Sequence, residues 1–193
     1  MIPPLNSSGV LPPFIPTLGV TIPAAMAPYK TTPSEIVTRF ATSPERNTIL
    51  RGLMDYRQLL NDSGVTDGFQ WIDGSYVENC EIIRGLSPHD IDVVTFAERP
   101  LNCHNDALWD EFVENKRVTL FDRPGIKSRF LCDAYYQDMA LPNKVLVERA
   151  RYWFGLFSHQ RVTYLWKGLL EIPLQSDDMV ALELLSRGGI NVP

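Results

Sequence analysis

Hydrophobic residues recur every three to four positions in the stretch that follows Ser43. The apolar side chains that fall on one face of a helix there are Ile49, Leu53, Tyr56 and Leu60. Ser43 is a favoured N-cap, Pro44 suits the first helical position, and Gly64 is a favoured C-terminal stop. The pattern therefore predicts an amphipathic helix from Pro44 to about Gly64.

Three short apolar runs have the composition of β-strands. They cover residues 69–72, 90–96 and 130–136, and a helix is predicted over 105–116. In the second run acidic and apolar positions alternate, which places the acidic side chains on one face of the strand and the apolar side chains on the other.

The last third of the chain has its own pattern. It predicts a helix over 142–157, a β-rich stretch over 162–174, and a last short helix from a Ser176 cap to Gly188.

The N-terminal segment is set apart by proline. Residues 1–33 hold eight of the fifteen prolines, so neither a helix nor a central strand is expected there. The sequence is equally compatible with an extended arm that packs along the domain and with a flexible tail. The chain thus divides into a proline-rich arm (1–33), an α/β (α+β) core (34–141) and a helical and β extension packed on that core (142–193). The core is expected to be a mixed β-sheet backed by helices.

Composition and charge narrow the classes of function. The 193 residues are 45% hydrophobic and 21% charged, which is typical of an ordinary globular domain. The net charge is −5 with no run of like charges, so nucleic acid is not expected to bind through bulk electrostatic attraction. A nucleotide substrate would need a metal ion to offset its phosphates.

Three cysteines without paired spacing argue against a disulfide framework or a zinc ribbon. No apolar run approaches the roughly 20 residues of a membrane span, and the N-terminus lacks the pattern of a secretory signal. We expect a cytoplasmic protein with no membrane partner.

A glycine–serine turn follows the first predicted strand, at Gly74 and Ser75. Where a strand opens into a helix through such a turn, backbone N–H groups and the helix dipole favour a phosphate oxygen. Glycine allows the ligand to approach the backbone closely. Gly74 and Ser75 are therefore candidate nucleotide-binding residues.

Fourteen residues separate Ser75 from the acidic strand with Asp90 and Asp92. Residues i and i+2 of a strand share a face, so the two carboxylates project together. Placing them side by side is unfavourable unless a cation joins them, and Mg²⁺ prefers one or two carboxylates plus substrate phosphates. Asp90 and Asp92 are candidate metal ligands.

Asp133 is a lone acid in the apolar and aromatic run 130–136. We interpret it as a third carboxylate of the same site, because its neighbours are expected to be buried. The alternative is a solvent-facing residue on an edge strand.

This combination resembles the DNA polymerase β-like nucleotidyltransferase superfamily, and more closely a small, poorly characterised bacterial group within it. The segments that carry the resemblance are residues 11–13, 71–77, 88–93 and 167–172. It implies a nucleotidyltransferase-type sheet and in-line transfer of a nucleoside monophosphate from an NTP, such as ATP, to a hydroxyl of a protein, a tRNA or a nucleotide, with release of pyrophosphate.

The resemblance also implies residue roles. Asp90 and Asp92 would bind Mg²⁺ or Mn²⁺, and Asp133 would be a further ligand that helps to deprotonate the attacking hydroxyl. Gly74 and Ser75 would hold the triphosphate. The settings it implies are bacterial toxin–antitoxin and antiviral (anti-phage) defence systems, with a toxin, antitoxin or defence effector as protein partner.

The chain departs from this pattern after the turn. Many active relatives carry Arg-Gly there, whereas Glu78 and Glu81 follow here with Arg84 as the only base before the acidic strand. An inactive transferase fold that serves as an antitoxin or complex subunit is therefore the alternative, and metal-dependent phosphodiester hydrolysis is a third. The bases that can compensate, each more readily read as surface, are Lys127, Arg129, Lys144 and Arg149.

Overall fold

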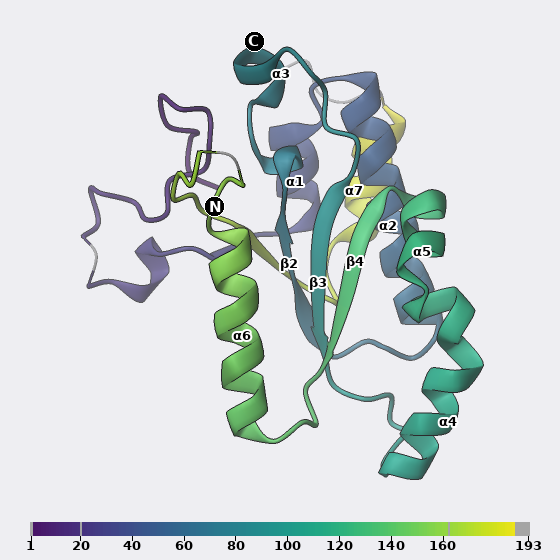
Figure 1. The fold of residues 1–193 in the computed structure, drawn as a ribbon. Coiled ribbons are helices and arrows are strands. Elements are labelled where there is room, and N and C mark those ends of the chain that lie inside the picture. Colours follow the sequence, from purple (N-terminus) through teal and green to yellow (C-terminus); the bar gives the residue numbers. More distant parts are fainter. Residues whose placement is uncertain (1, 20, 162, 188–193) are drawn as a thin grey trace.

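The computed structural model describes residues 2–19, 21–161 and 163–187. These residues form a mixed five-stranded sheet (Figure 1). In spatial order its strands are β1 (Tyr29–Lys30), β5 (Leu170–Pro173), β2 (Gly68–Asp73), β3 (Ile91–Ala97) and β4 (Cys132–Asp138). The expected α/β class with a mixed sheet is confirmed.

The register of the central strands places acidic residues in one row. β2 and β3 are antiparallel, with Asp73 opposite Asp92. β3 and β4 are parallel, with Asp92 opposite Asp133. Register partners point to the same face of a sheet, so carboxyl side chains from three successive strands lie next to one another.

Four helices cover one face of the sheet (Figure 1). They are α1 (Pro33–Phe40), α2 (Pro44–Asp62), α5 (Arg123–Phe130) and α7 (Asp178–Ser186). α2 is the predicted helix, and the Ser43 hydroxyl caps it by accepting a hydrogen bond from the Arg46 N–H at 3.3 Å. α2 approaches α5 so closely that a Cβ on Gly52 would overlap with the carbonyl of Phe130.

Helix α6 (Asn143–Phe157) covers the opposite face. The ring of Trp153 lies 4.4 Å from that of Tyr135 on β4, and the ring of Phe154 lies 6.4 Å from that of Trp71 on β2. Asp133 is two residues from Tyr135, and Asp73 is two residues from Trp71. Because strand side chains alternate between faces, the row of aspartates lies on the side of the sheet that α6 covers.

The connection from β3 to β4 is helical. It contains α4 (Asp106–Lys116), a π-helical turn η3 (Arg117–Phe121) and α5. α4 coincides with the helix predicted over 105–116, whereas α5 was not predicted. The predicted strand 130–136 instead begins at Cys132, because Phe130 ends α5 and Leu131 adopts a left-handed conformation (φ 55°) that turns the chain into the sheet.

The β-rich prediction for 162–174 is wrong for most of its length. Among the described residues of this stretch, regular strand structure is limited to β5, and Trp166 forms a single bridge with His159. Tyr164 has a positive φ of 55°, which breaks the extended backbone. α1 was also not predicted. The last helix, α7, begins at Asp178 instead of following a Ser176 cap, and Gly188 lies outside the described residues.

Segments from both ends of the chain join the central sheet. β5 lies between β1 and β2, in parallel with β1 and antiparallel to β2. In the N-terminal segment, which also holds the short 3₁₀ turn η1 (Pro23–Ala25), Val10 and Leu11 are fully buried. The Gly168 N–H donates a hydrogen bond to the carbonyl of Leu11 at 2.8 Å. Among the described residues, no helix combines the length and apolarity that crossing a membrane requires.

Candidate functional site

The residues singled out from the sequence line a single cavity of about 500 Å³. They are Gly74, Ser75, Asp90, Asp92 and Asp133. The cavity lies where β2 ends and where β3 and β4 begin, so antiparallel and parallel pairing together bring these segments to the same edge of the sheet.

Gly74 has a backbone conformation that only glycine adopts readily, with φ 86° and ψ −168°. A Cβ at this position would overlap with the Oδ2 of Asp92. Glycine therefore lets the turn lie directly against the acidic row. After Ser75 the chain forms a three-residue 3₁₀ turn, η2 (Ser75–Val77), and then the five-residue helix α3 (Cys80–Arg84). Because both helices are short, phosphate donors at this turn are single backbone N–H groups and not the end of a long helix dipole.

Asp92 lies at the centre of the acidic row. Its pKa is raised, first by burial and then by the neighbouring charges of Asp90 and Asp133. Such a carboxyl favours a cation close by, because positive charge offsets both the desolvation and the repulsion.

Two basic side chains of α5 meet this acidic row. The Lys127 ammonium group forms an ion pair with Asp90 and lies 3.7 Å from Oδ2 of Asp133. Arg123 donates to Oδ1 of Asp133 at 2.8 Å, and its guanidinium group lies 3.7 Å from the ring centre of Tyr135. Their i, i+4 spacing is the signal that points to a shared helix face, but it is readable only once α5 is recognised as a helix.

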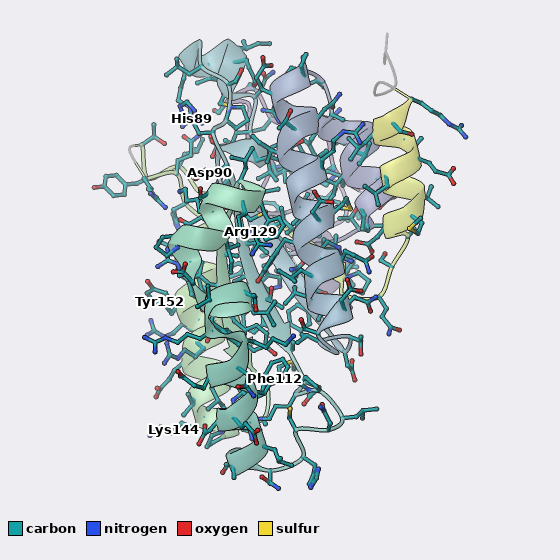
Figure 2. All side chains as sticks on the ribbon, turned by 90° about the vertical axis from the view of Figure 1, so that its right-hand side faces the viewer. His89, Asp90, Phe112, Arg129, Lys144 and Tyr152 are labelled. Atoms are coloured by element: carbon teal, nitrogen blue, oxygen red, sulfur yellow. The ribbon has the colours of Figure 1, made fainter. Side chains whose placement is uncertain are left out.

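The other bases proposed from the sequence do not line the cavity. Among Arg129, Lys144 and Arg149, none is part of its described lining. Figure 2 shows Asp90 near one end of the molecule and Lys144 near the other. In their place the described lining contains Arg84 and Arg161, and the positive charge of Arg161 partly offsets the rise in the pKa of Asp92.

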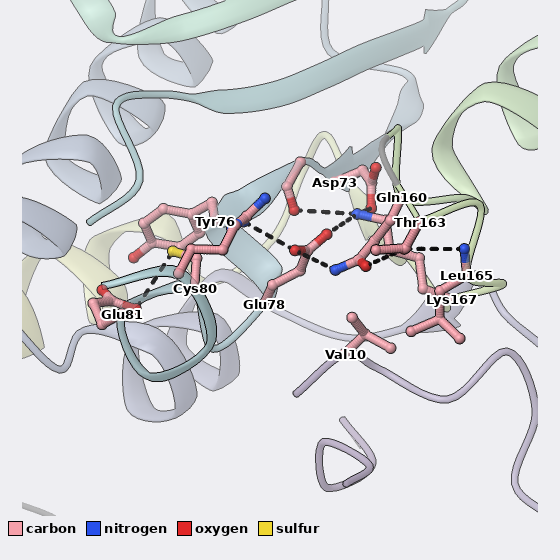
Figure 3. Close-up of polar contacts among 12 residues, drawn as sticks. Val10, Asp73, Tyr76, Glu78, Cys80, Glu81, Gln160, Thr163, Leu165 and Lys167 are labelled. Atoms are coloured by element: carbon pink, nitrogen blue, oxygen red, sulfur yellow. Dashed lines mark hydrogen bonds and ion pairs between the residues drawn. The ribbon is translucent and has the colours of Figure 1, made fainter. Parts of the chain in front are cut away.

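Asp73, Glu78 and Lys167 form a buried ion cluster (Figure 3), and Lys167 also donates to the carbonyl of Gly74. The Lys167 ammonium group lies 2.9 Å from Oδ1 of Asp73 and 2.8 Å from Oε1 of Glu78. Oε2 of Glu78 accepts hydrogen bonds from Arg84 at 3.0 Å and from Gln160 at 2.8 Å. In the sequence, Glu78 stands after the turn where many active relatives carry Arg-Gly; in the structure its charge is balanced by Lys167 and Arg84.

Burial also shifts the titration of this cluster. It raises the pKa of Asp73 to about 7, because complete desolvation outweighs the attraction of Lys167. Burial alone lowers the pKa of Lys167, but Asp73 and Glu78 together reverse the effect and raise it above the usual value. Lys167 therefore carries a full positive charge at neutral pH.

The far wall of the cavity comes from the end of α6 and the segment after it. Its described residues are Leu156, Phe157, His159, Gln160, Arg161 and Thr163. Phe157 and Trp153 are both buried with 4% of their surface exposed, and of the two only Phe157 is part of the described lining. The wall combines an apolar part with polar and basic groups facing the acidic row.

The donor set suits a hard divalent cation, since it consists of carboxylate oxygens beside an open cavity. Within the described residues, no three acidic, histidine or cysteine side chains are already grouped around one point as metal ligands. Lys127 and Arg123 instead supply the positive charge by pairing with Asp90 and Asp133. Asp90, Asp92 and Asp133 would be the residues to hold such an ion, which would have to replace the Lys127 ammonium group between Asp90 and Asp133.

Comparison with known proteins places the chain in a family but assigns no activity. No curated protein and no solved structure matches it. One family model, described as a family of unknown function (DUF6932), matches residues 3–173. The match contains every described strand and ends with the last residue of β5. The chain belongs to this family of unknown function, DUF6932.

Proposed function

We propose that this protein is a metal-dependent nucleotidyltransferase that transfers a nucleoside monophosphate from an NTP to an acceptor hydroxyl. The observation that carries the proposal is the convergence of three aspartates and a glycine–serine turn on one cavity. In this proposal the fold is of the nucleotidyltransferase type, as the sequence resemblance implies.

Asp90, Asp92 and Asp133 would hold Mg²⁺ or Mn²⁺. When bound, the ion offsets the charge of the triphosphate and of the attacking and leaving oxygens. The backbone N–H groups of Gly74 and Ser75 bind phosphate oxygens. Asp133 accepts the proton of the acceptor hydroxyl, whose oxygen forms a bond to the α-phosphorus. The bond from this phosphorus to the bridging oxygen breaks, and pyrophosphate leaves.

Positive charge from the protein also supports the proposal. Arg84, Lys127 and Arg161 line the cavity from three different segments. The missing Arg-Gly after the turn therefore does not leave the cavity without bases. Lys127, once released from Asp90, is free to contact a phosphate, because about half of its side-chain surface is exposed.

The acceptor and the setting follow from the resemblance alone. A protein, tRNA or nucleotide hydroxyl is the acceptor class, in the cytoplasm and within a bacterial toxin–antitoxin or anti-phage system. The net charge of −5 means that a tRNA acceptor would be held by local contacts.

The second candidate is a non-catalytic binding protein that uses the same fold, such as an antitoxin or complex subunit. The ion pairs that Lys127 and Arg123 make with Asp90 and Asp133 favour it, because they satisfy these carboxylates without a metal.

Label transfer separates the two candidates. The purified protein is incubated with each α-labelled NTP and Mg²⁺ or Mn²⁺, with and without cellular RNA and candidate partner proteins. We expect label on an acceptor from the native protein and from the Asp110→Asn control, whose residue is exposed on α4. The Asp90→Asn/Asp92→Asn variant should lose it. Absence of transfer and of any NTP-dependent rise in melting temperature would favour the binding protein.

A further inference from the structure

Lys167 is a cavity-lining lysine whose side chain is 3% exposed. Its ammonium group faces three oxygens, at 2.9 Å from Asp73, 2.8 Å from Glu78 and 3.3 Å from the carbonyl of Gly74. An ammonium group has three N–H donors. Glu78 and the carbonyl of Gly74 accept hydrogen bonds from it, and Asp73 forms an ion pair with it, so described protein groups engage its charge and keep it from a nucleotide phosphate.

The backbone that carries Lys167 is held on both sides. Its own N–H donates to the carbonyl of Ser158 at 2.8 Å, and the next N–H, from Gly168, donates to the carbonyl of Leu11. A Cβ on Gly168 would overlap with the carbonyl of Pro12, so the two chain segments touch backbone to backbone. The backbone of Lys167 is thus held next to the turn by hydrogen bonds to the residue that follows α6 and to the N-terminal segment.

Gly74 is the contact partner of Lys167 whose backbone conformation most needs to be restrained. Gly74 has φ 86°, and glycine has more accessible backbone conformations than any other residue. Without a restraint, the N–H groups of the turn would therefore point in many directions. A hydrogen bond accepted by the Gly74 carbonyl limits rotation of the peptide plane that also carries the N–H of Ser75. Preorganised backbone donors bind phosphate more strongly than mobile ones, because no ordering is needed on binding.

We propose that Lys167 is a positioning residue, which fixes the carbonyl of Gly74 and so aims the N–H groups of the Gly74–Ser75 turn at the nucleotide phosphates without touching the nucleotide. The inference rests on the proposed function for the identity of the ligand. The restraint that Lys167 places on the turn does not require a bound ligand.

The test therefore begins with nucleotide-free protein. Amide hydrogen exchange at Gly74 and Ser75 is measured by NMR in the native protein and in the Lys167→Met/Glu78→Gln variant. The paired change removes the Lys167 cation together with the Glu78 charge. Asp73 is then the one carboxyl of the cluster that has lost its cation, and it can avoid a buried charge by binding a proton. We expect exchange at these two amides to be at least about tenfold faster in the variant, with other β2 amides unchanged.

Lys144→Met is the matched control, because it removes an exposed lysine at the other end of α6. It should leave exchange at the turn at the native rate. Native exchange at Gly74 and Ser75 in the paired variant would overturn the proposal. Glu78→Gln alone keeps the Lys167 contact to Gly74, so it should give a smaller increase.

A second measurement needs no variant. The ¹⁵N resonance of the Lys167 ammonium group is followed while Mg²⁺ and ATP are added to the native protein. We expect it to stay in place while the amide resonances of Gly74 and Ser75 move. A coupling or a large shift at the ammonium group would show direct phosphate contact and overturn the proposal. If neither ATP nor any of the other three NTPs moves these resonances, the proposed function fails, while the exchange experiment still decides whether Lys167 orders the turn.

Discussion

Asp92 on β3 and Asp133 on β4 are direct register partners in the parallel pair of strands at the edge of the sheet. Asp92 has Asp73 of β2 as its partner on the other side. This arrangement concentrates negative charge on three strands in a row, and Lys127 and Lys167 approach the row from different segments. The candidate site is therefore a cluster of opposite charges, and changes to single members of this cluster should alter the pH response and the stability of this edge of the sheet.

Removal of Lys127 should strengthen divalent-metal binding. In the nucleotide-free protein a cation entering between Asp90 and Asp133 must displace the ammonium group of Lys127. We expect Lys127→Met to bind Mn²⁺ about threefold to tenfold more tightly, since a half-exposed ion pair contributes only modestly. Isothermal titration calorimetry measures the change. Lys144→Met should match the native protein, and equal affinity in both variants would contradict the role of Lys127 as a competing cation.

Neutralising Asp73 should change how stability depends on pH. Burial raises its pKa to about 7, compared with about 3.9 in an unfolded chain. Between about pH 4 and pH 7 the folded state keeps a proton that the unfolded state releases. The contribution of Asp73 to the free energy of unfolding is therefore largest below about pH 4 and declines as the pH rises to about 7.

The Asp73→Asn variant should lack this decline, so its free energy of unfolding relative to the native protein rises over the same pH interval. Urea unfolding at a series of pH values measures the difference. Asp110→Asn, at an exposed position, should run parallel to the native curve. A variant curve parallel to the native one would show that Asp73 is ionised throughout.

Replacing Gly74 by alanine should lower the free energy of unfolding more than the same replacement at Gly85, another glycine with positive φ. Gly74 has φ 86°, and an added Cβ would overlap with Asp92. Gly85 has φ 67° but no described atom within 4 Å of an added Cβ. We expect Gly74→Ala to lower the free energy of unfolding by about 3 kcal/mol and Gly85→Ala by about 1 kcal/mol. Chemical denaturation measures both, and equal losses would contradict close approach of the turn to Asp92.

A pair of helical glycines tests the packing of α2 on α5. Gly52→Ala would force the new methyl group into the carbonyl of Phe130, and we expect a loss of about 2 kcal/mol. Gly155 on α6 is exposed and has no described atom within 4 Å of an added Cβ. Gly155→Ala should therefore stabilise by about 0.5–1 kcal/mol through better helix propensity. A stabilising Gly52→Ala, measured by thermal unfolding, would contradict this helix contact.

Arg57 should be the ion that holds α7 to the sheet. It is buried on α2, forms an ion pair with Asp178 and donates to Gln70 at 2.8 Å and to the carbonyl of Pro173 at 2.9 Å. Arg57→Met leaves these groups without their donor, and we expect a loss of about 3 kcal/mol. Arg187→Met removes only an exposed pair with Glu183 and should change stability by less than about 0.5 kcal/mol. Urea unfolding compares the two, and similar small effects would contradict the anchoring role.

Local patterns were sufficient for several elements. The helix from Pro44 was predicted from its cap and apolar spacing, because both signals act within a few residues. The shared face of Asp90 and Asp92 followed from the period of a strand. α5 was not predicted, because its short run contains Pro124 and Gly125 and has little amphipathic pattern, and Lys127 was consequently interpreted as a surface residue.

Alternation and turn chemistry along the chain were thus enough to indicate an α/β fold and to select Gly74, Ser75 and the aspartates as candidates. The pairing of β5 between β1 and β2, and with it the arrival of Lys167 under a turn formed nearly a hundred residues earlier, emerged only from the folded chain. Periodicity is set by backbone geometry over neighbouring residues. Contacts between distant segments depend instead on which surfaces bury the most apolar area and best satisfy their polar groups, a choice that no local pattern records.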